Sequence, residues 1–269
     1  MNTEENRNEE SFGTGDCVQQ DFSSVNENSE SDKCKPERKS RTGQKACILS
    51  CLVCSLVFIL LISSVVFYLY GNSAFQCFVG KCYFFGRFGA AQNYAKSVEW
   101  FKKSAEQGEA EGQNYLACCY EYGCGVDKDY SEALKWYRKS AEQGDSAGQN
   151  NLAYLYFTGC GVVRDYNEAV KWYRKAAEQG QVSAQNSLAC CYMGGYGVTK
   201  DHAEAVKWFR KSAEQGGADA QYNLGRCYED GYGVNKDHDE ALRWYKRAAE
   251  QGNKDAKEKL RQFASKQDK

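Results

Sequence analysis

The sequence predicts an all-α protein, a solenoid of about five helix-turn-helix units that are 36 residues long. All five tryptophans are spaced 36 residues apart, from Trp100 to Trp244. The tetrapeptide AEQG ends at five glycines with the same spacing, from Gly108 to Gly252. A GxGV turn occurs four times at this period, first at Gly123. Three interlocked markers at one period are the signature of a repeat array.

The first helix of each unit is predicted from a short apolar stripe. Leu116 and Tyr120 are four residues apart, so their side chains share one helix face, and the pair recurs in the next unit. The small Ala117 allows a neighbouring backbone to approach. The GxGV turn then ends the helix, because glycine adopts the left-handed backbone geometry of a helix terminus.

The second helix begins at a capping box. Asp129 stands three residues before Glu132, so the aspartate accepts free amide hydrogens and the glutamate is expected to reach back to the cap. Lysine and arginine gather in its later turns, where cations suit the helix dipole. In the segment WYRKAAEQG, we expect Trp172 to pack inward and Arg174 and Lys175 to face solvent.

The array spans residues 73–252, and both of its ends differ from the repeat. Residues 75–89 resemble a first helix and turn with one inserted residue near Arg87, and Asn93 is the helix cap of this unit. Residues 253–269 resemble a more highly charged first helix. We expect this segment to be a C-terminal capping helix, because the end of a solenoid needs a polar outer face.

These motifs resemble the Sel-one-like repeat family, which is related to the tetratricopeptide repeat. The resemblance rests on the A-x-x-LA-x-x-Y run, the GxGV turn, the D-x-x-EA helix start and the WYRKAAEQG helix end, and it covers roughly residues 73–269. It implies a right-handed α/α superhelix that acts as an adaptor and binds partner proteins on its concave face. It implies no catalytic residue and no cofactor.

The amino-terminal tail, residues 1–45, is predicted to be disordered because it carries few apolar side chains. Its charge is divided: residues 1–32 have a net charge of −8 and residues 33–45 a net charge of +5, which leaves about +2 for the rest of the chain. A nearly neutral main body disfavours nucleic-acid binding.

Residues 46–70 contain no charged side chain and are predicted to form a transmembrane helix. A cleaved signal peptide is the rival interpretation, which the long apolar run and the 45-residue leader disfavour. Six bases precede the run, so the positive-inside rule places the tail in the cytoplasm and the repeats in an extracytoplasmic compartment. Cys47, Cys51 and Cys54 share one face of this helix, either as acylation or dimerisation sites or as small apolar residues in lipid.

The sequence contains little evidence for a metal site or an enzyme active site. His202 and His238 occupy equivalent positions of stacked units, which lie too far apart to share a metal ion. No S-x-x-K, S-D-N or K-T-G motif occurs. We therefore expect neither an enzyme nor a small-molecule substrate. The alternative is a cysteine-rich repeat protein that binds or hydrolyses a β-lactam or peptidoglycan-type ligand, because cysteine-rich relatives resemble β-lactam binders.

Nine cysteines follow the apolar run, and whether they form disulfides is open. Cys82, Cys119, Cys191 and Cys227 occupy one equivalent helix position, and Cys124 and Cys160 share a turn position. Equivalent positions of adjacent units are too far apart for a disulfide. Any pairing must therefore join non-equivalent positions, and an odd number leaves one thiol over.

The candidate protein-binding residues are those that the repeat does not fix. They lie on the first helices, away from the Leu/Tyr stripe, and the alternative is an ordinary solvated surface. The residues are Tyr115, Tyr122, Asn151, Tyr154, Thr158, Ser187 and Arg226.

Overall fold

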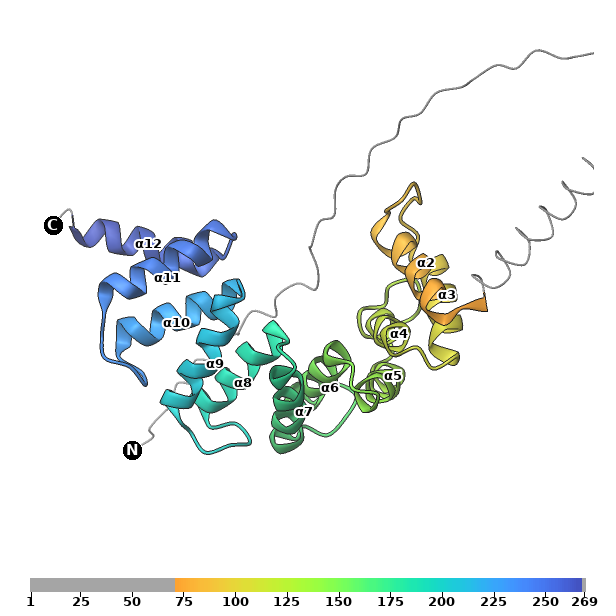
Figure 1. Cartoon of the computed structure of the whole chain (residues 1–269), viewed down its shortest axis with the longest axis horizontal. Coiled ribbons are helices and arrows are strands. Elements are labelled where there is room, and N and C mark those ends of the chain that lie inside the picture. Colours follow the sequence, from red (N-terminus) through yellow and green to blue (C-terminus); the bar gives the residue numbers. More distant parts are fainter. Residues whose placement is uncertain (1–70, 268–269) are drawn as a thin grey trace, which may run out of the picture. The chain divides into compact units, whose positions relative to one another are not determined.

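The computed structural model describes residues 71–267 and confirms an all-helical solenoid of repeated helix pairs (Figure 1). This range contains eleven helices and no strand. They are α2 (Ser73–Phe85), α3 (Tyr94–Glu106), α4 (Ala110–Tyr122), α5 (Tyr130–Glu142), α6 (Ser146–Thr158), α7 (Tyr166–Glu178), α8 (Val182–Gly194), α9 (His202–Glu214), α10 (Ala218–Asp230), α11 (His238–Glu250) and α12 (Lys254–Gln267). The predicted tail and apolar run, residues 1–70, lie outside the described range. Within residues 71–267, no helix has the length and apolar character to span a membrane.

Each unit consists of one even-numbered and one odd-numbered helix, from α2 and α3 to α10 and α11. The first helix of a unit packs against its own second helix and against the second helix of the preceding unit; α4, for example, contacts both α5 and α3. The last helix, α12, packs against α11. The units therefore stack in sequence order along a curved row (Figure 1).

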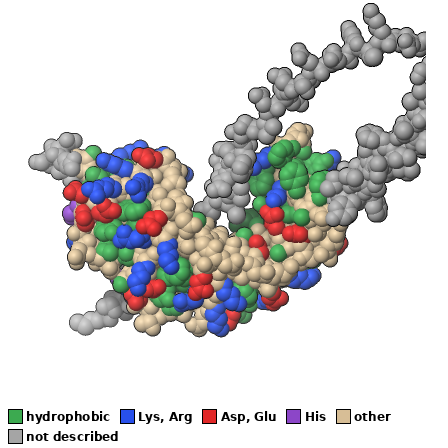
Figure 2. Space-filling model, in the orientation of Figure 1, with side chains coloured by type: hydrophobic (Ala, Val, Ile, Leu, Met, Phe, Trp, Pro, Cys, Tyr) green, Lys and Arg blue, Asp and Glu red, His purple; other side chains and the backbone are tan. Residues whose placement is uncertain are grey.

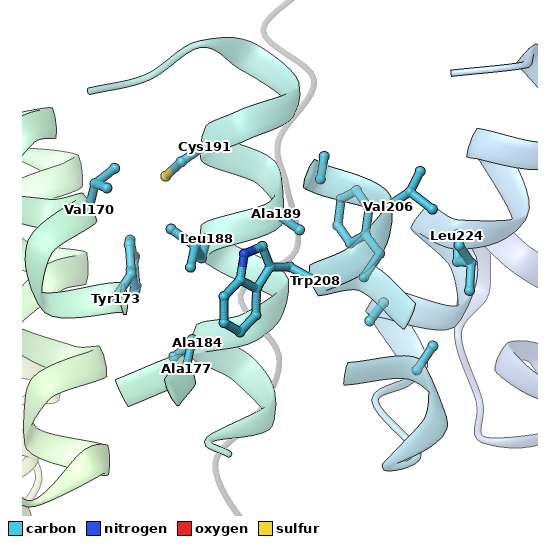
Figure 3. Close-up of a cluster of buried hydrophobic side chains, with 14 of the residues drawn as sticks. Val170, Tyr173, Ala177, Ala184, Leu188, Ala189, Cys191, Val206, Trp208 and Leu224 are labelled. Carbon is cyan, nitrogen blue, oxygen red and sulfur yellow. The ribbon is translucent and has the colours of Figure 1, made fainter. Parts of the chain in front are cut away.

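Adjacent units share one core. Leu188 on α8 is fully buried between Tyr173 of α7 and the second helix of its own unit (Figure 3). Trp208 on α9 belongs to the same cluster, as does Leu224 of α10, one unit further on. Because these side chains contact residues of neighbouring units, no unit buries its apolar face alone.

The GxGV turn requires glycine for two different reasons. Gly123 ends α4 in the left-handed region with φ of 72°, and its amide donates to the Cys119 carbonyl. Gly125 also has a positive φ, and a Cβ there would overlap the backbone carbonyl of Tyr94 in the preceding unit. The first glycine serves the helix terminus, whereas the second allows two units to approach closely.

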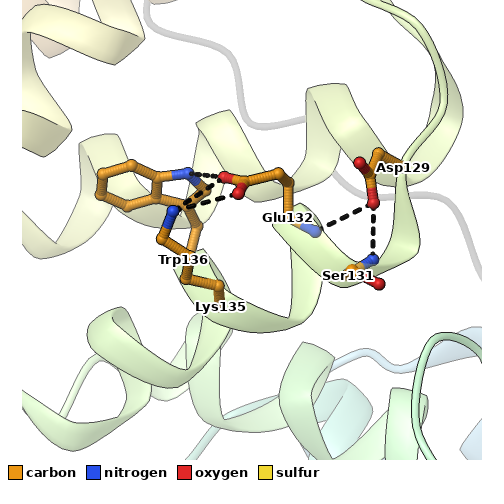
Figure 4. A network of polar contacts seen from close by, with 5 residues as sticks. All are labelled: Asp129, Ser131, Glu132, Lys135 and Trp136. Atoms are coloured by element: carbon orange, nitrogen blue, oxygen red, sulfur yellow. Dashed lines mark hydrogen bonds and ion pairs between the residues drawn. The ribbon is translucent and has the colours of Figure 1, made fainter.

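The cap of the second helices is only partly as predicted. Asp129 accepts from the amides of Ser131 at 2.8 Å and Glu132 at 3.1 Å, as expected (Figure 4). The Asp129 amide, however, donates to the Tyr120 carbonyl at 2.9 Å. Glu132 therefore does not reach back, and its carboxylate instead accepts from the Trp136 indole at 3.1 Å.

In the segment WYRKAAEQG, Lys175 is exposed as predicted, whereas Arg174 is half-buried, and both cations contact aromatic side chains. The Lys175 ammonium lies 3.9 Å from the centroid of the Trp172 ring, and the Arg174 guanidinium donates to the Tyr192 hydroxyl of the next unit at 2.8 Å. The amide of Gln179 donates to Gln149 of its own unit at 2.8 Å. The same glutamine bond occurs in the other four units, in the pairs Gln107–Gln76, Gln143–Gln113, Gln215–Gln185 and Gln251–Gln221.

Candidate functional site

Neighbouring first helices approach each other across the unit boundary. Helix α2 contacts α4, and α4 contacts α6. The Asn151 amide donates to Asn114 at 3.0 Å, and Asn223 donates to Asn186 in the same way at 3.0 Å. These contacts place the first helices on the inner side of the curved row (Figure 1).

We define the inner face as three positions of each first helix that share one side of it, spaced i, i+4 and i+7. Residue type at these positions changes from unit to unit, whereas the glutamine bonds do not. The positions are Cys77, Lys81 and Phe84; Asn114, Cys118 and Glu121; Asn150, Tyr154 and Phe157; Asn186, Cys190 and Met193; Tyr222, Arg226 and Glu229.

A carboxylate is buried in the inner face of the second unit. Glu121 is only 5% exposed, and the fully buried Tyr137 of α5 donates its hydroxyl to it at 2.6 Å. Burial raises the pKa of Glu121, and the Tyr137 and Tyr122 hydroxyls and the charge of Lys128 oppose that rise. The pKa of Tyr137 is raised as well, first by burial and then by the neighbouring Cys118 and Glu121.

The same pair recurs in the fifth unit with a cation added. Tyr245 donates to Glu229 at 2.6 Å, and Lys259 of α12 lies 3.0 Å from the same carboxylate. The residue equivalent to Lys259 beside Glu121 is Asn151, which is neutral. The carboxylate of the second unit therefore accepts from the Tyr137 hydroxyl but has no ion pair to any described residue.

Two predicted site residues, Tyr154 and Arg226, belong to the inner face, and a third, Asn151, is bonded to an inner-face residue. Tyr154 is half-buried and packs against the cores of both halves of the array. Burial raises the pKa of Tyr154, and the charge of Glu121 adds to the rise. Arg226 places its guanidinium 5.9 Å from the Tyr222 ring centroid. Asn151 lies in the asparagine bond between α4 and α6.

The other predicted residues lie elsewhere. Tyr115 packs between the first two units, where its ring stacks on Phe101 with centroids 5.0 Å apart. Ser187 acts on the buried Tyr173 hydroxyl, where it opposes the rise in pKa that burial causes. Tyr122 and Thr158 are exposed on the last turns of α4 and α6. The structure therefore places Tyr154 in the inner face near Glu121 and Arg226 in that of the fifth unit, and it bonds Asn151 to the inner-face residue Asn114.

Sequence reasoning missed Glu121 and Glu229, although a signal was present. The two glutamates are three repeat periods apart, and each faces a tyrosine on the second helix of its unit. In the fourth unit, Met193 takes the place of the glutamate, and the residue that faces it is Phe209, which has no hydroxyl. In the third unit, however, Tyr173 faces Phe157, so every glutamate at this position faces a tyrosine but not every tyrosine faces a glutamate.

The cysteines and histidines form no reactive centre within the described residues. Within residues 71–267, no cysteine is joined to another by a disulfide. Burial raises the pKa of Cys119, Cys191 and Cys227 to about 12, so these thiols stay protonated near neutral pH. Residues 71–267 contain no group of three or more side chains that could hold a metal ion. His202 packs on the Tyr232 ring.

Comparison with known proteins agrees with this architecture. Five consecutive segments match the model of the Sel1 repeat, at residues 73–109, 110–145, 146–181, 182–217 and 218–253. A search of curated proteins finds no match.

Three solved structures are similar to the chain. The Sel1 repeat protein from Oxalobacter formigenes is 40% identical with a TM-score of 0.67, over 71% of this chain and 76% of that one. A protective antigen of uropathogenic Escherichia coli with an SLR fold is 41% identical with a TM-score of 0.61, over 71% of this chain but only 40% of its own length. A Sel1 repeat structure from Klebsiella pneumoniae subsp. pneumoniae, 22% identical with a TM-score of 0.50 over 72% and 94%, shares the fold.

Proposed function

Because this chain belongs to the Sel1 repeat family, we propose that its repeats form a scaffold for a partner protein and that residues 46–70 anchor this scaffold in a membrane. Proteins built from these repeats are typically protein-interaction scaffolds and are generally not catalytic. We propose in addition that the partner binds the inner face, that residues 46–70 are the membrane anchor and that the repeats lie on the extracytoplasmic side.

The observation that carries the proposal is the contrast between fixed and variable positions. Glutamine bonds link the two helices of every unit, and arginine–tyrosine bonds such as Arg174–Tyr192 join successive units. The inner face instead changes from Cys118 through Tyr154 to Arg226 at one position. Contacts that build the solenoid are thus repeated, whereas this face offers each unit a different chemistry, which suits recognition of an asymmetric protein partner.

Membrane anchoring follows from composition. A stretch of 25 residues without charge is long enough to cross the hydrocarbon core, and six bases lie just before it. We therefore place the tail in the cytoplasm and the repeats in the periplasm, a lumen or the extracellular space. Protease added to the extracytoplasmic side of intact cells or vesicles should remove the repeats, and full protection of the repeats would show the opposite orientation.

Partner binding is tested by copurification with the full-length chain. Replacing Tyr154 and Arg226 with alanine should abolish copurification of a partner protein while the helical circular dichroism persists. The matched control replaces Lys135 and Lys171, which are exposed on second helices, and should retain the partner. Equal copurification with both variants would exclude the inner face. A β-lactam or peptidoglycan-type ligand remains the alternative, and no geometry in residues 71–267 favours it.

A further inference from the structure

The two ends of the array differ in chemistry. Helix α12 at the C-terminal end is rich in charge, as the end of a solenoid requires. Helix α2 at the other end instead carries Phe75, Phe78 and Phe85 on one face, at spacings of three and seven residues. In the third unit, the residue equivalent to Phe78 is Asn151, which bonds to the first helix of the preceding unit. Among the described residues, no unit precedes α2. Phe78 is exposed on this face, whereas Phe75 and Phe85 are half-buried, Phe85 beside Tyr115 of α4.

The inserted residue in the first turn extends the aromatic surface. Phe88 is 82% exposed and Phe78 is 43% exposed, with ring centroids 5.5 Å apart. Phe88 is also the only non-glycine residue in the described range with a positive φ, at 54°. Figure 2 shows hydrophobic side chains gathered over α2 and the loop that follows it. We call Phe75, Phe78, Phe85 and Phe88 the aromatic patch.

Bases predominate around the aromatic patch. Residues 71–98 contain three bases, Lys81, Arg87 and Lys96, and no acidic residue. Lys81 is paired with Glu111 of α4 at 2.8 Å, so Arg87 and Lys96 supply the positive charge near the patch. The Arg87 guanidinium lies 5.3 Å from the ring centroid of Phe85, within the patch itself. Aromatic rings accompanied by cations are the composition of protein segments that lie at a membrane interface with anionic lipids.

The patch is also held close to the predicted membrane span. Only Gly71 and Asn72 separate the end of the apolar run at Tyr70 from the start of α2 at Ser73. Three residue steps cover about 11 Å at most, so the beginning of α2 stays within that distance of the end of the span.

We propose that the aromatic patch docks on the lipid headgroup region of the membrane that holds residues 46–70. This inference rests on the proposed anchor. The headgroup region of a bilayer can bury the exposed aromatic rings, and its anionic lipids attract the neighbouring cations. The short connection to the span keeps the patch close to this surface. Docking would fix the orientation of the first unit and leave the inner face of the later units accessible to a partner.

The test uses the full-length chain in lipid nanodiscs of phosphatidylcholine and phosphatidylglycerol, with and without brominated acyl chains, which quench nearby tryptophan fluorescence. A Phe88→Trp variant adds a tryptophan to the patch. The matched control is Val163→Trp, which adds one at an 87% exposed site in the turn of the third unit. The signal is the emission that each substitution adds to that of the five native tryptophans.

We expect bromine to quench the emission added by Phe88→Trp several-fold more than that added by Val163→Trp. Equal and weak quenching in a chain that stays in the disc would overturn the docking and leave the anchor standing. Loss of the chain from the discs would overturn both. A blue shift at residue 88 without quenching would show that a second copy or another protein covers the patch, which also contradicts the proposal.

A second measurement does not depend on an added tryptophan. Trypsin cleavage after Arg87 should be several-fold slower in nanodiscs than in detergent. A Phe88→Asn variant, which tolerates the positive φ, should regain much of the detergent rate in nanodiscs. The same cleavage rate for the unsubstituted chain in both media would contradict docking.

Discussion

The Tyr137 hydroxyl donates to the buried carboxylate of Glu121 across 2.6 Å. The pair lies in the inner face of the second unit, and the equivalent pair in the fifth unit has the same length. The fourth unit has Met193 and Phe209 at the same positions. The fourth unit therefore shows which residues fill these two positions when the hydrogen bond is absent.

Replacing Tyr137 with phenylalanine should destabilise the repeats by about 1–3 kcal/mol, because Glu121 would lose a hydroxyl donor while staying buried. The double variant Glu121→Met, Tyr137→Phe copies the fourth unit and should recover most of that loss. Unfolding in urea measures both changes. A double variant less stable than Tyr137→Phe alone would show that the pair does not act as a unit.

The stability of the repeats should fall as pH rises through the range in which Glu121 ionises. Burial raises the pKa of this carboxyl in the folded chain. Its contribution is therefore fully present below the unfolded pKa of about 4.3 and is lost as pH rises through the folded value. Glu121→Gln should remove this component. Burial also raises the pKa of Asp219, so the total pH dependence is not due to Glu121 alone. The measurement is therefore the difference in melting temperature between the unsubstituted chain and Glu121→Gln at each pH. A difference that does not change with pH would contradict this prediction.

A lysine at position 151 should supply the cation that Glu121 lacks. In the fifth unit, the equivalent residue Lys259 lies 3.0 Å from Glu229. Asn151→Lys should therefore lower the pKa of Glu121 and weaken the pH dependence of stability.

Asn223→Lys is the matched control for this substitution. It breaks the same kind of asparagine bond but faces the uncharged Met193. It should cost stability and leave unchanged the pH-dependent component that Glu121→Gln removes. Identical behaviour of the two lysine variants would show that residue 151 does not reach the carboxylate.

The second glycine of the GxGV turn should tolerate alanine less well than the glycine after AEQG. Gly125 and Gly144 both have a positive φ, at 75° and 92°. A Cβ at Gly125 would overlap the carbonyl of Tyr94, whereas nothing lies within 4 Å of a Cβ at Gly144. The two substitutions share the backbone strain, so Gly125→Ala should cost about 1–3 kcal/mol more, the usual cost of overpacking. Equal melting temperatures would exclude a close contact between units.

The features that depend on short spacings could be predicted from the sequence. The helix pairs follow from the spacing of Trp100 to Trp244, and the helix start at Asp129 from a side chain that bonds two and three residues away. Such local contacts recur in every unit, so the period itself reports them.

The features that depend on contacts between different helices could not be predicted in this way. Glu132 does not complete the capping box, because the amide of Asp129 is already bonded to Tyr120 on the preceding helix. Tyr115 lies at a variable position, yet its ring stacks on Phe101 of the first unit. Glu121 looks like an ordinary charged helix residue until α5 supplies its partner. In each case the deciding contact joins residues from different helices.

The most direct test of the scaffold is photo-crosslinking by the full-length chain in its own membrane. A photoreactive amino acid replaces Tyr154 or Arg226, which lie in the inner face on first helices, or Lys135 or Lys171, which are exposed on second helices. We predict that the first-helix positions form a discrete crosslink to one protein partner and that the second-helix positions do not. Crosslinks of equal yield from both sets, or from the second helices alone, would contradict partner binding on the inner face.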